Sequence, residues 1–542
     1  MRSSNRVFLV VCFLVLSLSG FAQVNRYMVF FKDKTGTPFS VSNPNQFLSD
    51  KAIERRVKQE IAISEQDLPV TPAYTQGVAQ TGADVFFATR WLNGVLVQCD
   101  ASLITSVLAL PFVTRVEFVA PQQRLQKTGR LKGLFRIRES EPGGAQTRTQ
   151  LSMLGIPEMH ADGFHGEGVT IALLDGGFPG VNTIAPFQEM FAEGRYNDVV
   201  SHDFVRNTGN VFQYDDHGTK VLSVIAADIP DQFTGGASQA NFQLYVTEDG
   251  SSEYRIEEYN WLFAAERADS AGVDIISSSL GYYDFDLANM NYSTAQMDGK
   301  TAIVTQAAQL AAARGIIVVT SAGNEGNIPS WRIITAPADG VDVVAVANVN
   351  AQGVASPSSS RGPSSDQRIK PDLAALGSGV TIIQQSGAVG SASGTSLAAP
   401  LITSLIAGVW QKYPDYTAKE IVAALKKTAS RSGNPDNVIG YGIPSYVRLS
   451  DYFDRQGEAS FDVYPNPAFD TLTISPADPD EIPSCKIELI SRLGQIITTD
   501  EVSFTWANNA FRADISDLSS GIYFVRLTTP DRKFVYRIVK NR

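Results

Sequence analysis

The chain contains little cysteine and little histidine, and this limits the chemistry open to it. Only three cysteines (Cys12, Cys99 and Cys485) and four histidines occur among 542 residues. Cys12 lies in an N-terminal apolar run that we expect to be removed, and the other two fall in segments that we assign to different domains. A disulfide framework is therefore not expected, and no cysteine cluster indicates a structural zinc site.

Positive charge and long apolar runs are also scarce. The net charge is −11, from 45 basic and 56 acidic residues. This excess of acidic residues favours solubility and argues against a nucleic-acid partner, since such a partner requires a basic surface. Beyond the N-terminus, no apolar run reaches the ~20 residues that a membrane-spanning helix needs. The hydrophobic fraction of 44% is typical of globular proteins, and the length suits two or three domains.

Residues 1–22 have the pattern of a secretory signal peptide. Arg2 and Arg6 form the positive region, residues 7–16 form the apolar core, and Ala22 suits cleavage before Gln23. A membrane anchor is the alternative, but the apolar run is short for a span.

The segment from Ser393 to Pro400 is the most informative part of the chain. A Gly- and Ser-rich approach leads into a helix predicted over residues 397–410, which places Ser396 at a helix N-terminus. The N–H groups and dipole at such a terminus favour negative charge, and a serine that attacks a carbonyl creates an oxyanion beside itself. A serine hydroxyl is a weak nucleophile unless a base, held by an orienting group, activates it.

Two upstream segments offer these groups. His217 is the only histidine that leads into an apolar, helix-like run, residues 221–227, and it is the candidate base; taken alone, a helix cap is the simpler interpretation. Asp175 ends a predicted buried strand over residues 169–174, at the sheet edge where sites form in α/β proteins. It is the candidate orienting group, although an Asp before a glycine turn is common. The order Asp, His, Ser is one of the known chain orders of a catalytic triad.

A fourth segment adds an oxyanion donor. Asn324 follows Ser321-Ala322-Gly323 at the end of a strand predicted over residues 316–320. Its amide can donate to a developing oxyanion together with the backbone N–H of Ser396. Asn in a glycine-containing turn is ordinary, but the four motifs in this order predict an activated serine.

In these segments the sequence resembles the subtilisin-like serine proteases, the subtilase family, over roughly residues 151–446. The matching motifs are Leu174 to Gly177, His217 to Thr219, Ser321 to Asn324 and Gly394 to Pro400, with supporting matches at Ser279 to Gly281, Ser360 to Pro363 and Lys370 to Asp372. The resemblance implies a parallel-sheet α/β fold and endopeptidase activity. It also implies that Ser396 is the nucleophile, His217 the general base and then acid, Asp175 its orienting group, and Asn324 the oxyanion donor.

Two positions depart from the family pattern. Gly176 follows Asp175 where Ser or Thr is usual, and Leu397 stands where Met is common. The change at Gly176 removes a hydroxyl near the Asp–His pair, and it leaves room for an inactive member of the family.

The resemblance also implies a substrate-binding edge. Ser279, Leu280 and Gly281 follow a strand predicted over residues 273–276, and such an edge would pair with the substrate backbone, with Gly281 allowing a close approach. Ala322 and Gly323 complete the expected substrate-binding set. A serine-rich loop is the alternative. Substrates would be proteins or peptides, no cofactor is expected to be required, and calcium, which is common in the family, cannot be assigned to residues here.

Residues 23–123 show the order strand, helix, strand, strand, helix, strand. The predicted strands span residues 27–31, 84–89, 94–99 and 113–119, and the helices span residues 45–59 and 101–108. This order predicts a small α+β ferredoxin-like unit. The resemblance implies a propeptide that inhibits the enzyme until it is cleaved, with a stable accessory domain as the alternative. Residues 124–150, which carry several basic residues, would form an exposed activation linker.

Residues 151–452 alternate helices and strands, which predicts a parallel sheet with helices on both faces. The predicted helices span residues 256–271, 302–313, 397–410 and 417–428.

Residues 460–542 contain short strands separated by turn signals, which predicts a small β-sandwich. Tyr464 to Pro467, Leu518 to Tyr523 and Phe534 to Lys540 resemble the C-terminal sorting domain of type IX secretion cargo. That resemblance implies export through the periplasm and outer-membrane secretion machinery of a two-membrane bacterium, to the medium or the cell surface. A generic β accessory module is the alternative.

The sequence therefore predicts a secreted serine endopeptidase that acts through a covalent acyl-enzyme. Two alternatives remain. One is an inactive, secreted binding or surface protein with the subtilase fold. The other is an ester hydrolase, which is disfavoured because the Gly-x-Ser-x-Gly elbow of α/β-hydrolases is absent around Ser396.

Overall fold

The computed structural model describes residues 24–121, 147–456, 461–476, 485–497, 504–507, 509–529 and 533–541. The predicted signal peptide and most of the predicted activation linker lie outside these residues. Within them, no helix combines the length and the apolar character needed to cross a membrane. Cys99 and Cys485 are free thiols in the described part of the chain.

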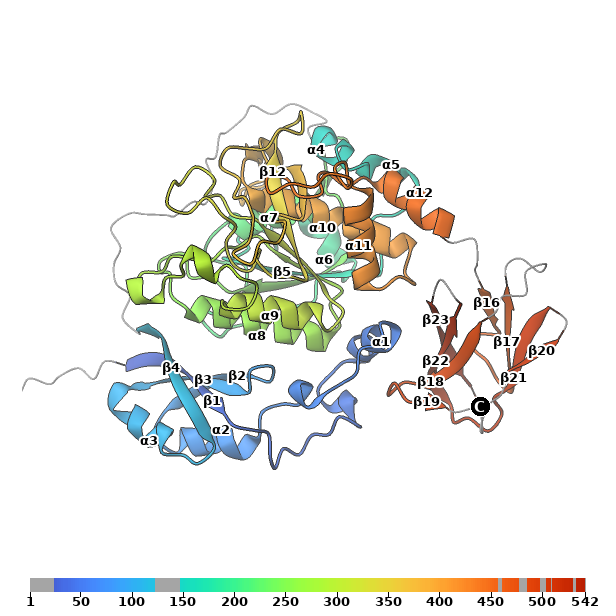
Figure 1. Cartoon of the computed structure of the whole chain (residues 1–542), viewed down its shortest axis with the longest axis horizontal. Coiled ribbons are helices and arrows are strands. Elements are labelled where there is room, and N and C mark those ends of the chain that lie inside the picture. The colour runs from blue at the N-terminus through green and yellow to red at the C-terminus, as the bar shows by residue number, and fades with distance from the viewer. Residues whose placement is uncertain are drawn as a thin grey trace, which may run out of the picture.

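A seven-stranded parallel sheet forms the centre of the molecule (Figure 1), in the order β13-β12-β11-β10-β5-β9-β6. Its strands are β5 (Thr170–Asp175), β6 (His202–Asp203), β9 (Asn241–Val246), β10 (Ile275–Ser278), β11 (Ile317–Ser321), β12 (Val343–Val349) and β13 (Leu373–Leu376). Every residue of β5, β10, β11, β12 and β13 is buried, as a parallel sheet covered on both faces requires.

Helices cover both faces of this sheet. Alternate residues of β5 point to opposite sides, so Ile171 and Leu173 pack into one core while Ala172 and Leu174 pack into the other. The first core includes side chains of α7 (His217–Ala226), α10 (Thr395–Lys412) and α11 (Ala418–Thr428), and the second includes side chains of α8 (Ile256–Ala271) and α9 (Ile303–Ala312). The four helices predicted for this region are confirmed: α8 has the predicted ends, and the ends of the other three differ by at most two residues.

Smaller elements complete the central region. They are α4 (Arg148–Ser152), α5 (Ile156–Ala161), α6 (Gln188–Ala192), α12 (Tyr446–Gln456), the pair β7 (Asp228–Ile229) and β8 (Phe233–Thr234), and the pair β14 (Val380–Ile383) and β15 (Val389–Ala392).

The N-terminal unit is an antiparallel sheet of β1 (Val24–Phe31), β2 (Asp84–Thr89), β3 (Gly94–Asp100) and β4 (Val113–Pro121), in the order β2-β3-β1-β4. This is the strand order of the predicted ferredoxin-like unit. One face of the sheet, which includes Met28, Phe30 and Leu96, joins the core formed by α8 and α9 of the central region.

The helices of this unit differ from the prediction. The expected helix over residues 45–59 is a short turn followed by α1 (Asp50–Lys58), and α1 does not cover the sheet. That place is taken by α2 (Pro72–Ala79), which was not predicted, together with α3 (Ile104–Leu108); Val78 and Val107 share a core with the sheet. α2 has eight residues, begins with a proline and contains Gly77, so its helical signal is weak.

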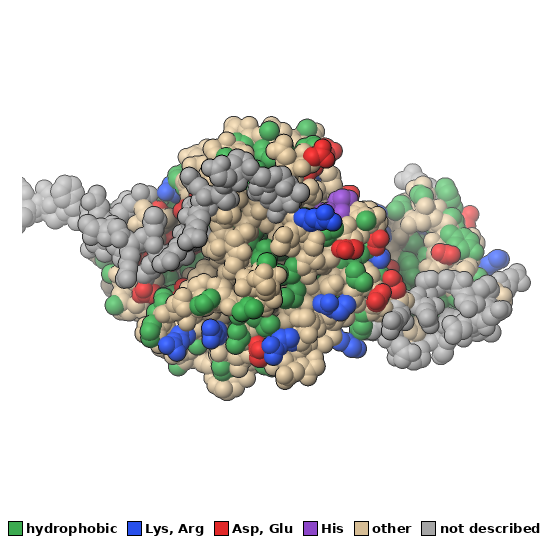
Figure 2. All heavy atoms as spheres, turned by 90° about the horizontal axis from the view of Figure 1, so that it is seen from above, with side chains coloured by type: hydrophobic (Ala, Val, Ile, Leu, Met, Phe, Trp, Pro, Cys, Tyr) green, Lys and Arg blue, Asp and Glu red, His purple; other side chains and the backbone are tan. Residues whose placement is uncertain are grey.

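The C-terminal region is the predicted β-sandwich, seen from above as a lobe beside the larger body (Figure 2). One sheet contains β16 (Phe461–Tyr464), β17 (Thr471–Pro476), β20 (Thr505–Ala507) and β21 (Ala510–Asp514), and the other contains β18 (Lys486–Ser491), β19 (Ile496–Ile497), β22 (Gly521–Thr528) and β23 (Lys533–Lys540). The two sheets share one apolar core, to which Leu472, Leu489 and Val525 belong.

Candidate active site

Asp175 and His217 form a buried pair. Asp175 is the last residue of β5 and His217 is the first residue of α7. The Nδ1 atom of His217 lies 2.6 Å from Oδ1 of Asp175, and the two residues are only 1–2% exposed. Burial by itself lowers the pKa of His217, but the charge and hydrogen bond of Asp175, aided by the charge of Asp215, outweigh it and raise the pKa above its usual value.

Ser396 lies in the first turn of α10, as the sequence predicts. Gly394 precedes the helix with an extended backbone, and Ser396 is the second helical residue, only 2% exposed. α10 packs against α7, the helix that begins at His217. The carbonyl of Ser396 accepts a hydrogen bond of 2.7 Å from the Ser279 hydroxyl, which fixes the start of α10 to the segment that follows β10.

Thr395, in the first turn of α10, orients the side chain of Asn324. Its Oδ1 accepts hydrogen bonds from the backbone N–H of Thr395 at 3.0 Å and from the Thr395 hydroxyl at 3.1 Å. Since the amide oxygen is engaged in this way, the amide nitrogen is the end that remains for an incoming oxygen. Ser396 and Asn324 both line one cleft of about 940 Å³.

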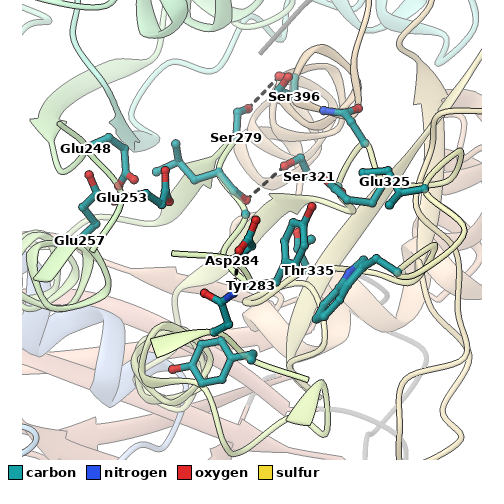
Figure 3. Close-up of a pocket in the computed structure, with 18 of the residues that line it drawn as sticks. Glu248, Glu253, Glu257, Ser279, Tyr283, Asp284, Ser321, Glu325, Thr335 and Ser396 are labelled. Carbon is teal, nitrogen blue, oxygen red and sulfur yellow. Dashed lines mark hydrogen bonds between the residues drawn. The ribbon is translucent and has the colours of Figure 1, made fainter. Parts of the chain in front are cut away.

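The cleft also contains most of the expected substrate-binding set. Ser279, Leu280, Gly281 and Gly323 line it beside Ser396 and Asn324, and Figure 3 shows Ser279 next to Ser396. Gly323 has φ +104°, and a side chain there would collide with Glu325 and Ser360. The Ser360 motif therefore supports the turn that carries Asn324: the Ser360 hydroxyl donates to Glu325 and its N–H donates to the Gly323 carbonyl.

Two positions of this set also pack against other parts of the protein. A Cβ on Gly281 would collide with the Thr335 hydroxyl, so the missing side chain makes room for Thr335, and Gly281 itself lines the cleft. Ala322 is fully buried in a small core with Ile334, Ala338 and Ala345 and is not among the residues that line the cleft. Its side chain therefore packs inside the protein and supports the turn that carries Asn324.

The structure also shows what Gly176 allows. A Cβ on Gly176 would lie 3.3 Å from Cβ of Asp215 and 3.8 Å from Cβ of Glu248. The backbone N–H of Gly176 donates to Oδ1 of Asp175 at 2.7 Å, while Oδ2 of Asp175 has no hydrogen-bond partner among the described residues. The missing hydroxyl is therefore not replaced by another donor, but the Asp–His pair is formed without it.

The far wall of the cleft holds a group of acidic residues that sequence reasoning missed. Oxygen atoms of Glu248, Glu253 and Glu257 lie within 4.8 Å of one another, which could suit a cation. The sequence signal that could have revealed this group is the high density of acidic residues between positions 248 and 258.

Models of three protein families match the chain. The subtilase family model matches residues 166–442, just over half of the 542 residues. The chain belongs to the subtilase family. The peptidase S8 propeptide domain of Bacteroidota matches residues 26–132 of this subtilase, and the secretion system C-terminal sorting domain matches residues 462–541. The sorting domain makes this subtilase a secreted or cell-surface protein.

Named relatives agree with this assignment. Subtilisin E of Bacillus subtilis is 27% identical over 287 residues, which cover 52% of this chain and 66% of that protein. Serine protease AprX of Bacillus subtilis is 29% identical over 309 residues, which cover 51% of this chain and 65% of that protein. The matches thus span just under two thirds of these relatives. The solved structure of the epidermin leader peptide processing serine protease from Staphylococcus aureus shares the fold, with a TM-score of 0.54 and 16% identity over 79% of this chain and 98% of that one.

Proposed function

We propose that this subtilase is a secreted serine endopeptidase that hydrolyses peptide bonds through a covalent acyl-enzyme. The Ser396 hydroxyl attacks the peptide carbonyl while His217 takes its proton, and His217 then gives that proton to the leaving amine. Asp175 holds the imidazole in the required tautomer and stabilises the imidazolium. The Asn324 amide and the Ser396 N–H stabilise the oxyanion, and water then releases the acyl group by the reverse sequence.

One observation carries this proposal: the 2.6 Å contact between Asp175 and His217. Such a buried pair raises the pKa of the imidazole, and it occurs at the start of α7, which packs against the helix that begins with Thr395 and Ser396. A carboxylate at this distance fixes the tautomer of the imidazole and makes it more basic, and a general base for Ser396 uses both effects.

We also propose that the N-terminal unit acts as an inhibitor of the enzyme and that the C-terminal sandwich is recognised by outer-membrane secretion machinery. The propeptide and sorting-domain matches support these roles, because each assigns the segment to a family with that description. Neither unit contributes a residue to the proposed catalytic set.

Labelling with a fluorophosphonate probe tests the catalytic proposal. The probe phosphonylates a serine only if the hydroxyl is activated, so mass mapping should find the label on Ser396 of the matured protein. The label should be lost in His217→Ala. A folded, matured protein that takes no label would favour the alternative, an inactive secreted binding protein, to which the absent hydroxyl at Gly176 gives some support.

A further inference from the structure

The cleft beside Ser396 is strongly acidic. Among the described residues that line it, six are acidic and none is Lys or Arg. The six are Glu248, Asp249, Glu253, Glu257, Asp284 and Glu325. A cleft lined by one sign of charge attracts ligands of the opposite sign.

Three of these side chains converge on one point. Glu248, Glu253 and Glu257 have oxygen atoms within 4.8 Å of one another, and Figure 3 shows their carboxylates turned toward each other. Glu248 follows β9, whereas Glu257 belongs to the first turn of α8, so the end of a strand and the start of a helix build the group together.

Glu257 provides a separate observation that points to a ligand. The residue is only 2% exposed, and its Oε1 accepts a hydrogen bond of 2.9 Å from the backbone N–H of Asp249. Its Oε2 is buried and has no hydrogen-bond partner among the described residues. A buried carboxylate oxygen without a donor is costly, so the group lacks a donor that a bound molecule can supply.

Glu248 connects this group to the proposed catalytic residues. Its Oε1 accepts hydrogen bonds from the hydroxyls of Tyr282 at 2.5 Å and Thr247 at 2.7 Å, and Tyr282 directly follows the Ser279–Gly281 segment. The charges of Asp175 and His217 also act on the Glu248 carboxyl. A peptide that occupies the cleft beside Ser279 to Gly281 would therefore pass within reach of the three carboxylates.

The electrostatics of the three carboxyl groups favour a cation. Burial raises the pKa of Glu248 to about 7, and burial together with the charges of Glu253 and Glu248 raises the pKa of Glu257 well above its usual value. Protons thus relieve the repulsion when no ligand is bound, and a cation would take their place.

We propose that Glu248, Glu253 and Glu257 form a subsite that binds a Lys or Arg side chain of the peptide substrate. The proposal rests on the proposed function and adds a substrate class to it. An ammonium group carries three donors on one atom, which matches three converging carboxylates. Calcium takes six to eight oxygen ligands, more than three carboxylates supply with one oxygen each, and it is the competing occupant that the experiments below distinguish.

An extended peptide presents alternate side chains to the same wall of the cleft. The preference for a basic residue should therefore be confined to one position of the substrate, or to two positions that are two residues apart, and should not extend to its neighbours.

A peptide library that places Lys, Arg or the uncharged norleucine at each position in turn tests the proposal. The wild type should prefer Lys or Arg at one such position by about tenfold or more in kcat/KM, as expected for a desolvated charge pair. The double variant Glu248→Gln/Glu257→Gln keeps the shape of both side chains and should lose most of this preference. The matched control is Glu158→Gln, an exposed residue of α5, which should retain it.

Binding is measured separately with the Ser396→Ala protein, which cannot turn over. Fluorescence anisotropy with the Lys and norleucine peptides should show the same preference, and the added Gln substitutions should remove it. If the library is not cleaved but Ser396→Ala still prefers the Lys peptide, the endopeptidase assignment fails and the subsite stands.

Two results would overturn the subsite. One is an equal response to Lys and norleucine at every position, or a preference that the double variant keeps. The other is a metal site: calcium chloride alone would raise the melting temperature of the wild type but not of the double variant, and would suppress the preference for Lys.

Discussion

Two hydrogen bonds to one side-chain oxygen decide which way the Asn324 amide points. Both come from Thr395, whose hydroxyl also donates to the Gly323 carbonyl at 3.2 Å. The turn that carries Asn324 and the first turn of α10 are thus fastened together by a residue adjacent to Ser396. Thr395 acts on the proposed oxyanion site through Asn324, as a positioning residue.

Substitution should separate these two roles. Asn324→Leu removes a donor to the oxyanion and should lower kcat by about 10²–10³ with little change in KM. Thr395→Val keeps the backbone donor and loses only the hydroxyl, so kcat should fall by about tenfold or less. Steady-state kinetics on one peptide measure both effects. Equal losses in the two variants would contradict the assignment of Asn324 as the direct donor.

The pKa of His217 should be visible in the pH dependence of activity. Asp175 and Asp215 raise this pKa above its usual value of about 6.5, and the base must be neutral to accept a proton. The rate should therefore fall as the pH decreases through a value above 6.5. Asp215→Asn removes one negative charge, lowers the pKa of His217 and should shift the acid limb of kcat/KM to lower pH by up to about one unit.

Asp215 also accepts a hydrogen bond of 2.8 Å from the backbone N–H of His217. Asp215→Asn can keep this hydrogen bond, because the side-chain oxygen of Asn is also an acceptor. Asp198→Asn, an exposed residue, is the control and should leave the profile unchanged. An identical acid limb in Asp215→Asn and the wild type would argue against His217 as the titrating group.

The proposed catalytic residues could be predicted because each stands at the end of an element that the sequence reveals. A buried apolar run ends at Asp175, at the carboxyl edge of the sheet, and a small-residue helix begins beside Ser396. The acidic group could not be found in this way. Glu248, Glu253 and Glu257 converge only because the loop after β9 turns back onto the start of α8, and no local pattern predicts that turn.

At the scale of elements, the Lys370-Pro371-Asp372 motif has a structural role. Asp372 is 2% exposed and accepts hydrogen bonds from the Lys370 ammonium at 2.7 Å and the Ala345 N–H at 2.9 Å, and it pairs with Lys426 of α11 at 2.7 Å. The ammonium of Lys370 also donates to the Val343 carbonyl at 2.8 Å. This network joins β12, the segment before β13, and α11.

Asp372→Ala should therefore be strongly destabilising. It would leave the buried Lys370 ammonium without its carboxylate, and breaking a buried pair in this way costs about 3–5 kcal/mol. Urea unfolding in the Ser396→Ala background, which prevents self-digestion, measures the loss. Asp366→Ala, which breaks a partly exposed pair with Arg368, is the control and should cost less than about 1 kcal/mol. Similar losses in the two variants would refute the role of burial.

The N-terminal helices show where element prediction fails. The sequence between residues 45 and 59 does form a helix, α1, but α1 is not the helix that covers the sheet of the ferredoxin-like unit. The spacing of apolar residues predicts that one face of a helix is buried, but it does not predict which element packs against that face. α2 was missed because eight residues with a proline and a glycine carry little helical signal, while its packing against the sheet makes it stable.

At the scale of the whole molecule, α1 joins all three regions. Toward the central region, Arg55 and Arg56 of α1 and Arg90 after β2 surround Asp269 of α8, which is fully buried, at 2.5–2.7 Å. Asp67 pairs with Arg56 at 3.1 Å and with Arg314 at 2.8 Å. Three guanidinium groups around one buried carboxylate hold the pKa of Asp269 below its usual value although burial opposes this.

The opposite side of α1 faces the sandwich. Ile53 and Val57 share an apolar cluster with Ile490, Phe524 and Val535 of β18, β22 and β23. Ion pairs surround this contact: Glu54 with Arg537 at 3.2 Å, and Glu60 with Arg526 at 3.1 Å and with Lys533 at 2.8 Å. The propeptide unit therefore contacts the sorting domain directly, a relation that three separately predicted domains did not suggest.

Charge reversal tests whether this contact holds the sandwich in place before maturation. Glu54→Lys/Glu60→Lys breaks three partly exposed pairs, each worth about 0.2–1 kcal/mol, and replaces attraction by repulsion, while both positions remain outside the buried Asp269 network. In the full chain carrying Ser396→Ala, small-angle X-ray scattering should show a larger radius of gyration for the variant than for the parent. Glu65→Lys, at an exposed position of the same unit, should leave the radius unchanged. If the double variant scatters like its parent, the apolar cluster alone holds the sandwich, and the ion pairs add nothing to its placement.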